Sequence, residues 1–250
     1  MQTQPFSVAL ITLNAAPQLE ACLQSVKFAD EIVVVDSGSR DNTEAIALKY
    51  GARFISQDWL GFGLQKQFAV AQASNDWVLC LDADEQVSED LRASITAALG
   101  HPEHHAYRMP RSNRFMGRYL RHGEGYPDWS LRLFDRRHAR WSDDAVHEKV
   151  LTGSEVGTLR GDLLHDSAED LGTYLDKQNR YTSLQAAALY QAGRRAHLAQ
   201  LVFSPVVRFV RFYFFRLGML DGIAGLVHIV IGCGNSFMKY AKLMALQKGE

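Results

Sequence analysis

The chain has 250 residues, of which 47% are hydrophobic and 22% are charged, and its formal net charge is −1. This length and composition are typical of one compact globular domain with an appendage. The near-neutral charge excludes a general nucleic-acid binder. The cysteines Cys22, Cys80 and Cys233 have no paired spacing for zinc, which indicates reduced thiols and a cytosolic protein. The N-terminus lacks a basic segment followed by an apolar one, so we expect no export signal.

Strand and helix patterns alternate through the first hundred residues. Short apolar runs end in polar residues, as buried parallel strands do, and the segments between them have helical apolar spacing. The predicted elements are a strand at 7–14, a helix at 17–27, a strand at 31–36, a helix at 42–50, a strand at 52–56, a helix at 64–73 and a strand at 77–82. This order predicts an α/β fold, a mostly parallel sheet with helices on both faces.

The last of these strands ends in three nearby carboxylates, Asp82, Asp84 and Glu85. If the extended geometry continues, side chains two residues apart share a face, so Asp82 and Asp84 can direct oxygens to one point. Such a pair suits Mg²⁺ or Mn²⁺, which combines one or two carboxylates with substrate phosphate oxygens. The pair alone is a weak motif, because Asp-x-Asp also occurs by chance on solvated loops. Glu85 is left out of the metal shell, since it can support the site from behind or precede the next helix.

Polar residues also end the two earlier strands, Asn14 the first and Asp36 the second. In open α/β sheets, ligands bind outside the carboxyl ends of the strands, so we expect both residues in one crevice with Asp82. Asp36 has an alternative role as a cap of the turn at Ser37 and Gly38.

Four segments together resemble the family 2 glycosyltransferases, inverting enzymes with the GT-A fold: residues 12–14, 34–43, 63–67 and 81–85. Their common order and spacing are far more specific than any single motif. The resemblance covers roughly the first hundred residues and implies a UDP-sugar donor. It implies that Thr12, Asn14, Asp36, Lys66 and Asp82 bind the nucleotide-sugar, and that Asp84 with Asp82 holds a metal on its diphosphate.

The resemblance implies a particular position at the nucleotide for Asp36 and Lys66. Asp36 is expected on the uracil or ribose side of the nucleotide. Lys66 is expected near the nucleotide because of the resemblance; on its own it would be a solvated residue on the helix at 64–73.

The segment 101–161 is rich in arginine and should form the acceptor side. Pro110 and Gly117 argue against one continuous helix, so we predict strand and loop. Arginine forks bind phosphate well, which favours an anionic acceptor or the donor diphosphate over a merely solvated basic surface. The arginines are Arg108, Arg111, Arg114, Arg118, Arg121, Arg132, Arg136, Arg137 and Arg140.

Within this segment, residues 125–134 and 146–150 resemble the bacterial lipopolysaccharide-core glucosyltransferases of family 2, which carry similar Tyr-Pro-Asp, Arg-Leu-Phe and His-Glu sequences. The chain departs from that pattern just before Tyr126, where Glu124 and Gly125 stand in place of an aromatic residue. The resemblance implies contacts with the acceptor or the diphosphate from Tyr126, Asp128, Arg132 and His147.

Inversion at an anomeric carbon needs a positioned base that takes the proton of the attacking acceptor hydroxyl. Glu148 occupies the position that the resemblance marks for this base, with His147 as a possible orienting neighbour. Asp128 is the second candidate. The alternative for Glu148 is an exposed strand residue without a catalytic role.

The last quarter of the chain is predicted to be helical. A helix is expected at 170–192, and residues 205–216 combine aromatic residues with Arg208, Arg211 and Arg216 on one arc of a helix. That arrangement is typical of a helix lying in the membrane surface. The apolar segment 220–233 is too short and polar for a confident membrane span. A dimer interface and a helical cap on the sheet are the alternatives.

We therefore expect a GT-A domain at 1–168, with a nucleotide-sugar half at 1–100 and an acceptor half at 101–168, followed by a membrane-associating region at 169–250. It would transfer a sugar, glucose from UDP-glucose, through a β bond to an anionic glycolipid such as the lipopolysaccharide inner core, at the inner face of the cytoplasmic membrane. Polyprenyl phosphate and another surface glycolipid are alternative acceptors. A nucleotidyltransferase and a non-catalytic membrane scaffold are the alternatives from other classes, although residues 14–17 lack the glycines that a nucleotidyltransferase loop needs.

Overall fold

The computed structural model describes residues 3–144, 148–167 and 170–248. It divides into two compact units. Unit 1 comprises residues 1–111 and 128–166, and unit 2 comprises residues 112–127 and 167–250. The chain therefore enters unit 2 twice, whereas the predicted boundary kept residues 112–127 with the acceptor half.

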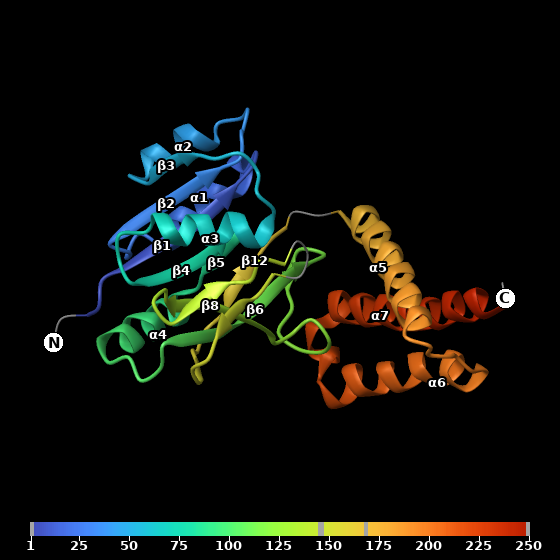
Figure 1. Cartoon of the computed structure of the whole chain (residues 1–250). Coiled ribbons are helices and arrows are strands. Elements are labelled where there is room, and N and C mark those ends of the chain that lie inside the picture. The colour runs from blue at the N-terminus through green and yellow to red at the C-terminus, as the bar shows by residue number, and fades with distance from the viewer. Residues whose placement is uncertain (1–2, 145–147, 168–169, 249–250) are drawn as a thin grey trace. The chain divides into compact units, whose positions relative to one another are not determined.

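Unit 1 contains every strand and helix expected in the first hundred residues, with ends shifted by at most two residues (Figure 1). Its elements are β1 (Phe6–Thr12), α1 (Ala16–Ser25), β2 (Glu31–Asp36), α2 (Thr43–Lys49), β3 (Arg53–Ser56), α3 (Phe62–Gln72), β4 (Trp77–Asp82), β5 (Glu85–Val87), α4 (Glu89–Gly100), β6 (Ala106–Phe115, which runs on into unit 2), β8 (Asp128–Asp135), β9 (Ala139–Trp141), β10 (Val150–Thr152), β11 (Val156–Thr158) and β12 (Leu163–His165). The arginine-rich middle segment forms strands and loops, as Pro110 and Gly117 indicated.

The main sheet has the strand order β3-β2-β1-β4-β8-β6-β12-β5. Strands β3, β2, β1 and β4 are parallel, β8 is antiparallel to both β4 and β6, and β12 is antiparallel to β5. In the register of the parallel strands, Thr12 lies beside Asp36, and Ile11 lies beside Asp82. The polar ends of three strands therefore meet at one edge of the sheet, as expected.

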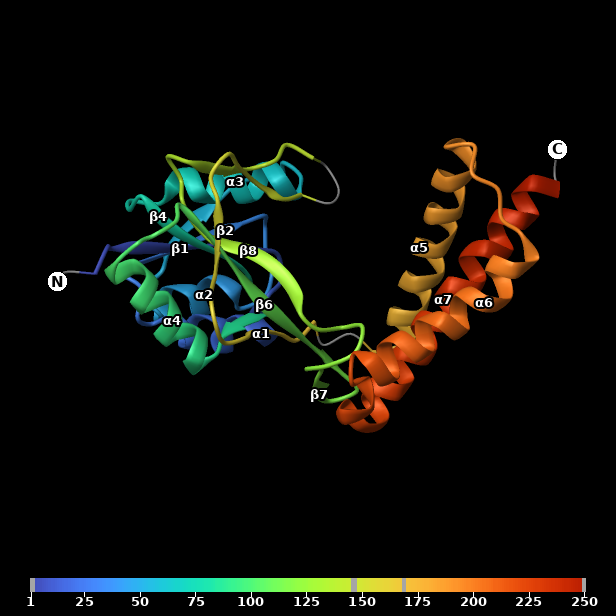
Figure 2. The same cartoon turned by 90° about the horizontal axis from the view of Figure 1, so that it is seen from below.

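Alternate residues of each central strand enter different cores. On β1, Val8 and Leu10 pack in a cluster with α1, α2 and α4, whereas Ala9 packs in a second cluster with α3. Figure 2 shows α3 on one side of the sheet and α1, α2 and α4 on the other. Both faces of β1, β2 and β4 are thus buried, which is why these strands are apolar along their whole length. The predicted α/β class, with helices on both faces, is confirmed.

Unit 2 is mainly helical. Its elements are β7 (Arg118–Tyr119), α5 (Leu171–Gln191), α6 (Leu198–Phe209), the π-helix η1 (Val210–Phe215), the 3-10 helix η2 (Gly218–Asp221) and α7 (Gly222–Lys248). Both α5 and α6 pack along α7 (Figure 1). The C-terminal helical region is therefore present as expected.

Two details of unit 2 differ from the prediction. The segment 205–216 is not one regular helix, because α6 gives way to the π-helix η1 after Phe209. The helix that contains most of the apolar segment 220–233, α7, continues to Lys248. In this extension Lys242 donates hydrogen bonds to Asn179 and Thr182 of α5. By length and composition alone, Leu198–Phe215 and Gly218–Lys248 could each cross a membrane, a test that core helices of soluble proteins also pass.

Candidate active site

The carboxyl end of β2 holds Asp36 in a closed set of hydrogen bonds. Its Oδ2 accepts from Thr12 Oγ1 at 2.8 Å and from Ser39 Oγ at 2.5 Å, and its Oδ1 accepts from the backbone N–H groups of Gly38 and Ser39. Gly38 has a φ of +94°, which favours glycine. Asp36 therefore caps this turn, the alternative that the sequence left open, and its contact with uracil or ribose stays a prediction.

Asn14 ties the loops after β1 and β2 together. Its backbone N–H donates to Ser39 Oγ at 2.7 Å, and its Oδ1 accepts from the backbone N–H of Arg40 at 2.9 Å. Asn14 has a φ of 52°, a left-handed conformation that asparagine tolerates better than most residues. These bonds fix the backbone at the mouth of the crevice.

Seven charged side chains of alternating sign form a continuous series beneath this edge of the sheet. Each is within 2.6–3.4 Å of the next. In order, the members are Glu148, Lys66, Asp82, Arg132, Glu85, Arg111 and Asp128. We call this series the charge chain. It joins the two candidate bases, Glu148 at one end and Asp128 at the other, through side chains of separate elements.

The opposite charges at the centre of the charge chain neutralise one another. Burial raises the pKa of the Asp82 carboxyl, but Arg132 and Lys66 outweigh this effect and hold that pKa well below its usual value. Burial lowers the pKa of Arg132, whereas Glu85 and Asp82 raise it by more. Because Lys66 Nζ lies 3.0 Å from Asp82 Oδ1 and Arg132 Nη2 lies 2.8 Å from its Oδ2, both carboxylate oxygens have a cationic partner.

Asp84 has a different partner. The extended geometry of β4 ends at Asp82, and the chain turns at Ala83 and Asp84 before β5 begins. The condition of a continued strand is therefore not met, and Asp82 and Asp84 contact different groups. Both still line one cavity, and their joint role in holding a metal stays a prediction. Asp84 Oδ2 lies 3.2 Å from Nε2 of His165, at the end of β12.

The pair of Asp84 and His165 fits a divalent cation. Adjacent ligands of an octahedral ion with bonds of about 2.1 Å lie about 3 Å apart, close to the spacing found here. A donor set of one carboxylate and one imidazole suits Mn²⁺ better than Mg²⁺, which strongly prefers oxygen. Both side chains are partly exposed, so an ion there can also reach a substrate.

A cavity of about 660 Å³ opens beside this pair. That size is in the range of small-molecule and cofactor sites. Trp59 and Phe62 form an edge-to-face pair with ring centroids 4.8 Å apart, and each is about half exposed. Its lining includes Thr12, Asn14, Trp59, Phe62, Asp82, Asp84 and His165. The lining thus combines an aromatic pair with the polar ends of the strands.

The remaining predicted site residues fall in three places. Arg132 is in the charge chain and is 5% exposed, and its Nε is a buried donor without a hydrogen-bond partner among the described residues. Asp128 accepts two bonds from Arg111. Tyr126 belongs to unit 2, where its carbonyl accepts from Arg216. His147 lies outside the described residues.

The sequence left two alternatives for Glu85 and did not single out Arg111 or His165. Glu85 is fully buried and accepts from Arg132 and from the backbone N–H of Asp82, so it supports the site from behind. Arg111 was one of many arginines. His165 ends an apolar strand in the same way as Asp82, so the pattern that singled out Asp82 could have identified it.

A second group of possible metal ligands lies at the other end of β4, because Asp135 pairs with Trp77 in the sheet register. His105, Asp135 and His138 bring their ligand atoms within 4.8 Å of one another. Arg137 already occupies both oxygens of Asp135. The Asp84–His165 pair, which borders the cavity, is the better candidate for the metal.

The model of glycosyl transferase family 2 matches residues 7–154, more than half of the chain. The chain belongs to this family. It is similar to a lipopolysaccharide core biosynthesis glycosyltransferase, LpsC, of Rhizobium meliloti, with 32% identity over 96% of this chain and 92% of the relative. It is therefore an enzyme, a glycosyltransferase, as the sequence indicated.

Two further likenesses agree with this assignment. An uncharacterised glycosyltransferase of Rickettsia typhi is 29% identical over 96% of this chain and 87% of its own length. The structure of S. aureus TarS 1–349 in complex with UDP superposes with a TM-score of 0.51 at 15% identity, over 99% of this chain and 92% of that one. This last likeness supports the GT-A type of fold alone.

Proposed function

We propose that this glycosyltransferase transfers glucose from UDP-glucose, with inversion and thus through a β bond, to a lipid-linked saccharide such as the lipopolysaccharide inner core. The single observation that carries the proposal is the charge chain beside the cavity, with Glu148 at one end and the Asp84–His165 pair nearby. The name of the Rhizobium meliloti relative supports the choice of lipopolysaccharide core as the acceptor class.

The donor would lie along the carboxyl edge of β1, β2 and β4. Thr12, Asn14 and the turn capped by Asp36 would hold the nucleoside end, and Trp59 with Phe62 offers an apolar surface for a flat ring. Lys66 and Arg132 would lower the electrostatic cost of bringing a diphosphate close to Asp82. The orphan Nε of Arg132 is a spare donor for an anionic group.

Mg²⁺ or Mn²⁺ would be held by Asp84 and His165, and it would supply charge neutralisation for the diphosphate leaving group. Asp82 was predicted as a second ligand. Its two cationic partners make direct coordination less favourable, because an ion bound there would be repelled by Lys66 and Arg132. We therefore assign Asp82 to the compensated centre of the charge chain.

Glu148 would act as the base. Lys66 Nζ lies 3.0 Å from Glu148 Oε1 and so fixes the carboxylate, and no described residue donates to its other oxygen. As the acceptor oxygen forms its bond to the anomeric carbon, the hydroxyl proton passes to Glu148, and the bond between that carbon and the phosphate oxygen breaks to release UDP. Asp128 is less suited, because Arg111 holds it with two hydrogen bonds.

The assay for this proposal uses the full chain with Mn²⁺ or Mg²⁺ and a panel of UDP-sugars, and measures UDP release with and without lipopolysaccharide-core acceptors. We expect acceptor-dependent release with UDP-glucose, and a β linkage in the product by proton coupling in NMR. Transfer from a different nucleotide-sugar would contradict the donor assignment. Transfer only to polyprenyl phosphate would contradict the acceptor assignment.

A further inference from the structure

The two units carry opposite charges that the whole-chain value conceals. Unit 2 has 13 lysine and arginine residues against 6 acidic ones, a formal charge of +7, whereas unit 1 has 14 against 22, a formal charge of −8. A unit with this excess is attracted to anionic surfaces. The helical unit is therefore suited to such a surface, although the net charge of the chain is −1.

One face of α6 and η1 is apolar and exposed. Its exposed side chains recur at every fourth residue, which places them on one side of the helix, and they are between 39% and 66% exposed. They are Leu198, Val202, Val206, Val210 and Phe214. None of the residues of α6 or η1 is buried. No described element of unit 2 covers this face.

The exposure is greatest where α6 turns back into α7, at residues 214–223, which we call the hairpin tip. Phe215 is 80% exposed and Ile223 is 75% exposed. The exposed apolar residues of the hairpin tip are Phe214, Phe215, Leu217, Met219, Leu220 and Ile223. Six exposed large apolar side chains within ten residues are of a kind that marks a protein or membrane contact.

The hairpin tip presents positive charge and conceals its only acid. Asp221 is 1% exposed, and its carboxylate accepts from the backbone N–H groups of Arg121 and His122. Arg216 is exposed in the tip and Arg211 is exposed beside it, and Arg118 donates to the carbonyl of Leu220 at 3.1 Å. Because the acid is turned inward, the outer surface combines apolar groups with arginines alone.

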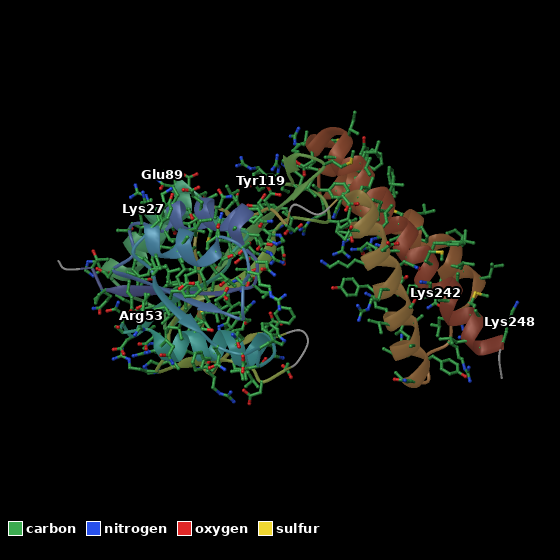
Figure 3. The ribbon with its side chains drawn as sticks, turned by 90° about the horizontal axis from the view of Figure 1, so that it is seen from above. Lys27, Arg53, Glu89, Tyr119, Lys242 and Lys248 are labelled. Atoms are coloured by element: carbon green, nitrogen blue, oxygen red, sulfur yellow. The ribbon has the colours of Figure 1, made fainter. Side chains whose placement is uncertain are left out.

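Arg208 does not belong to this set, which corrects the predicted arc of three arginines. It pairs with Glu124 inside unit 2. The side of α7 that faces α5 is covered by that helix. Lys242, labelled in Figure 3, donates to Asn179 and Thr182. Leu243 is buried in one apolar cluster with Ala186. The hairpin thus carries charged groups along its length as well as exposed apolar ones, which favours shallow insertion over a membrane span.

We propose that the hairpin tip inserts into the surface of an anionic lipid bilayer. Phe215 and Ile223 enter the boundary between headgroups and acyl chains, and Arg118, Arg211 and Arg216 contact the headgroup phosphates. The inference rests on the proposed function in one respect, because a lipid-linked acceptor gives the enzyme a reason to be at a membrane. Membrane attachment would then be specific to ten residues, 214–223.

The test is co-sedimentation of the full chain with vesicles of phosphatidylcholine, alone or with 30% phosphatidylglycerol. The wild type should bind the anionic vesicles and not the neutral ones. Removing two positive charges in Arg211→Gln/Arg216→Gln should weaken binding by about thirtyfold. The matched control Arg194→Gln/Lys248→Gln removes the same charge outside the hairpin tip and should bind nearly as the wild type does.

A second pair of variants tests whether the apolar side chains of the hairpin tip enter the bilayer. Phe215→Ser/Ile223→Ser should lose at least tenfold in vesicle binding, whereas Leu48→Ser, which removes an exposed leucine of unit 1, should lose nothing. Circular dichroism melts check that each variant is folded. Because Phe215 and Ile223 are exposed, the serine variant should melt within a few degrees of the wild type.

Two results would overturn the proposal. One is wild-type protein that ignores anionic vesicles and sediments as a dimer, with Phe215→Ser/Ile223→Ser monomeric, since the tip would then be a self-association surface. The other is equal loss in the two charge variants. Transfer to a soluble core oligosaccharide, measured in parallel, should be normal in the tip variants; its absence in the wild type would contradict the proposed function and leave the vesicle result standing.

Discussion

Unit 1 and unit 2 treat charged and apolar groups in opposite ways. In unit 1 the charges of the site are drawn inward and compensate one another along the charge chain, while its strands bury their apolar residues on both faces. In unit 2 the apolar residues of α6 and the hairpin tip are exposed beside arginines. Buried compensated charge suits the stabilisation of a charged substrate, and exposed apolar surface suits a partner outside the chain.

The largest effect should come from removing the cation, because it tests whether the charges of unit 1 serve a metal-dependent reaction. EDTA should abolish transfer, and excess Mn²⁺ should restore it. Asp84→Asn and His165→Ala should each need far more Mn²⁺ for half-maximal activity, since each loses one ligand. Full activity of either variant in EDTA would exclude a metal at this pair.

Glu148→Gln tests the end of the charge chain. The amide keeps the size of the side chain but cannot take a proton, so kcat should fall by 10²- to 10⁴-fold while KM for the donor changes little. Asp128→Asn, at the other end, is the matched control and should lose less than tenfold. If the two variants exchange these effects, Asp128 is the base.

Arg132→Met tests how much the stability of unit 1 depends on the ion pairs of the charge chain. The change leaves Glu85 buried without its 2.7 Å partner and removes one of the two cations on Asp82. Breaking a buried ion pair in this way costs about 3–5 kcal/mol in the free energy of unfolding, measurable by urea titration. Arg92→Met, which breaks an exposed pair with Glu89, should leave the free energy of unfolding almost unchanged.

Trp59 tests whether the aromatic wall of the cavity contacts the donor. Trp59→Leu should raise the Kd for UDP by about tenfold, because a stacked ring contributes roughly 1–1.5 kcal/mol. Trp129→Leu removes another exposed tryptophan of unit 1, outside the cavity lining, and is the control. UDP should also quench the fluorescence of the wild type more than that of Trp59→Leu. Equal affinity and equal quenching in the two variants would remove Trp59 from the donor site.

The pH dependence of unfolding should show the smallest effect. The pKa of Asp82 is depressed in the folded protein relative to about 3.9 in the unfolded chain. A depressed folded pKa adds stability that is present above about pH 4 and is lost as the pH falls toward the folded value. The free energy of unfolding should therefore fall below pH 4 more steeply in the wild type than in Asp82→Asn. Parallel curves would show that Asp82 does not contribute.

The sequence predicted unit 1 well because its information is local. Each apolar run with a polar end specifies a buried strand and the side of the sheet where its last residue lies, so Asn14, Asp36 and Asp82 could be brought together from pattern alone. Such local patterns do not predict which distant segments pair in the sheet. His165 is 81 positions from Asp84, and only the antiparallel pairing of β12 with β5 brings them together.

The charge chain shows the same limit. Lys66, Asp82 and Glu148 were each singled out, but their contacts depend on the positions of α3, β4 and the segment before β10. In unit 2, the predicted arc of arginines depended on one regular helix with the same surroundings for each arginine. The π-helix η1 alters the positions of the side chains around the helix, and Arg208 pairs with Glu124, 84 positions away in the sequence.

The most direct test of the central claim is calorimetric titration of UDP-glucose with Mn²⁺ into Glu148→Gln and Asp84→Asn, side by side with the wild type. The two residues have separate tasks in this account, the proton for Glu148 and the cation for Asp84. Glu148→Gln should bind the donor with wild-type affinity, although it does not turn it over, and Asp84→Asn should bind it at least tenfold more weakly. Normal donor binding by Asp84→Asn, together with weak binding by Glu148→Gln, would contradict the account.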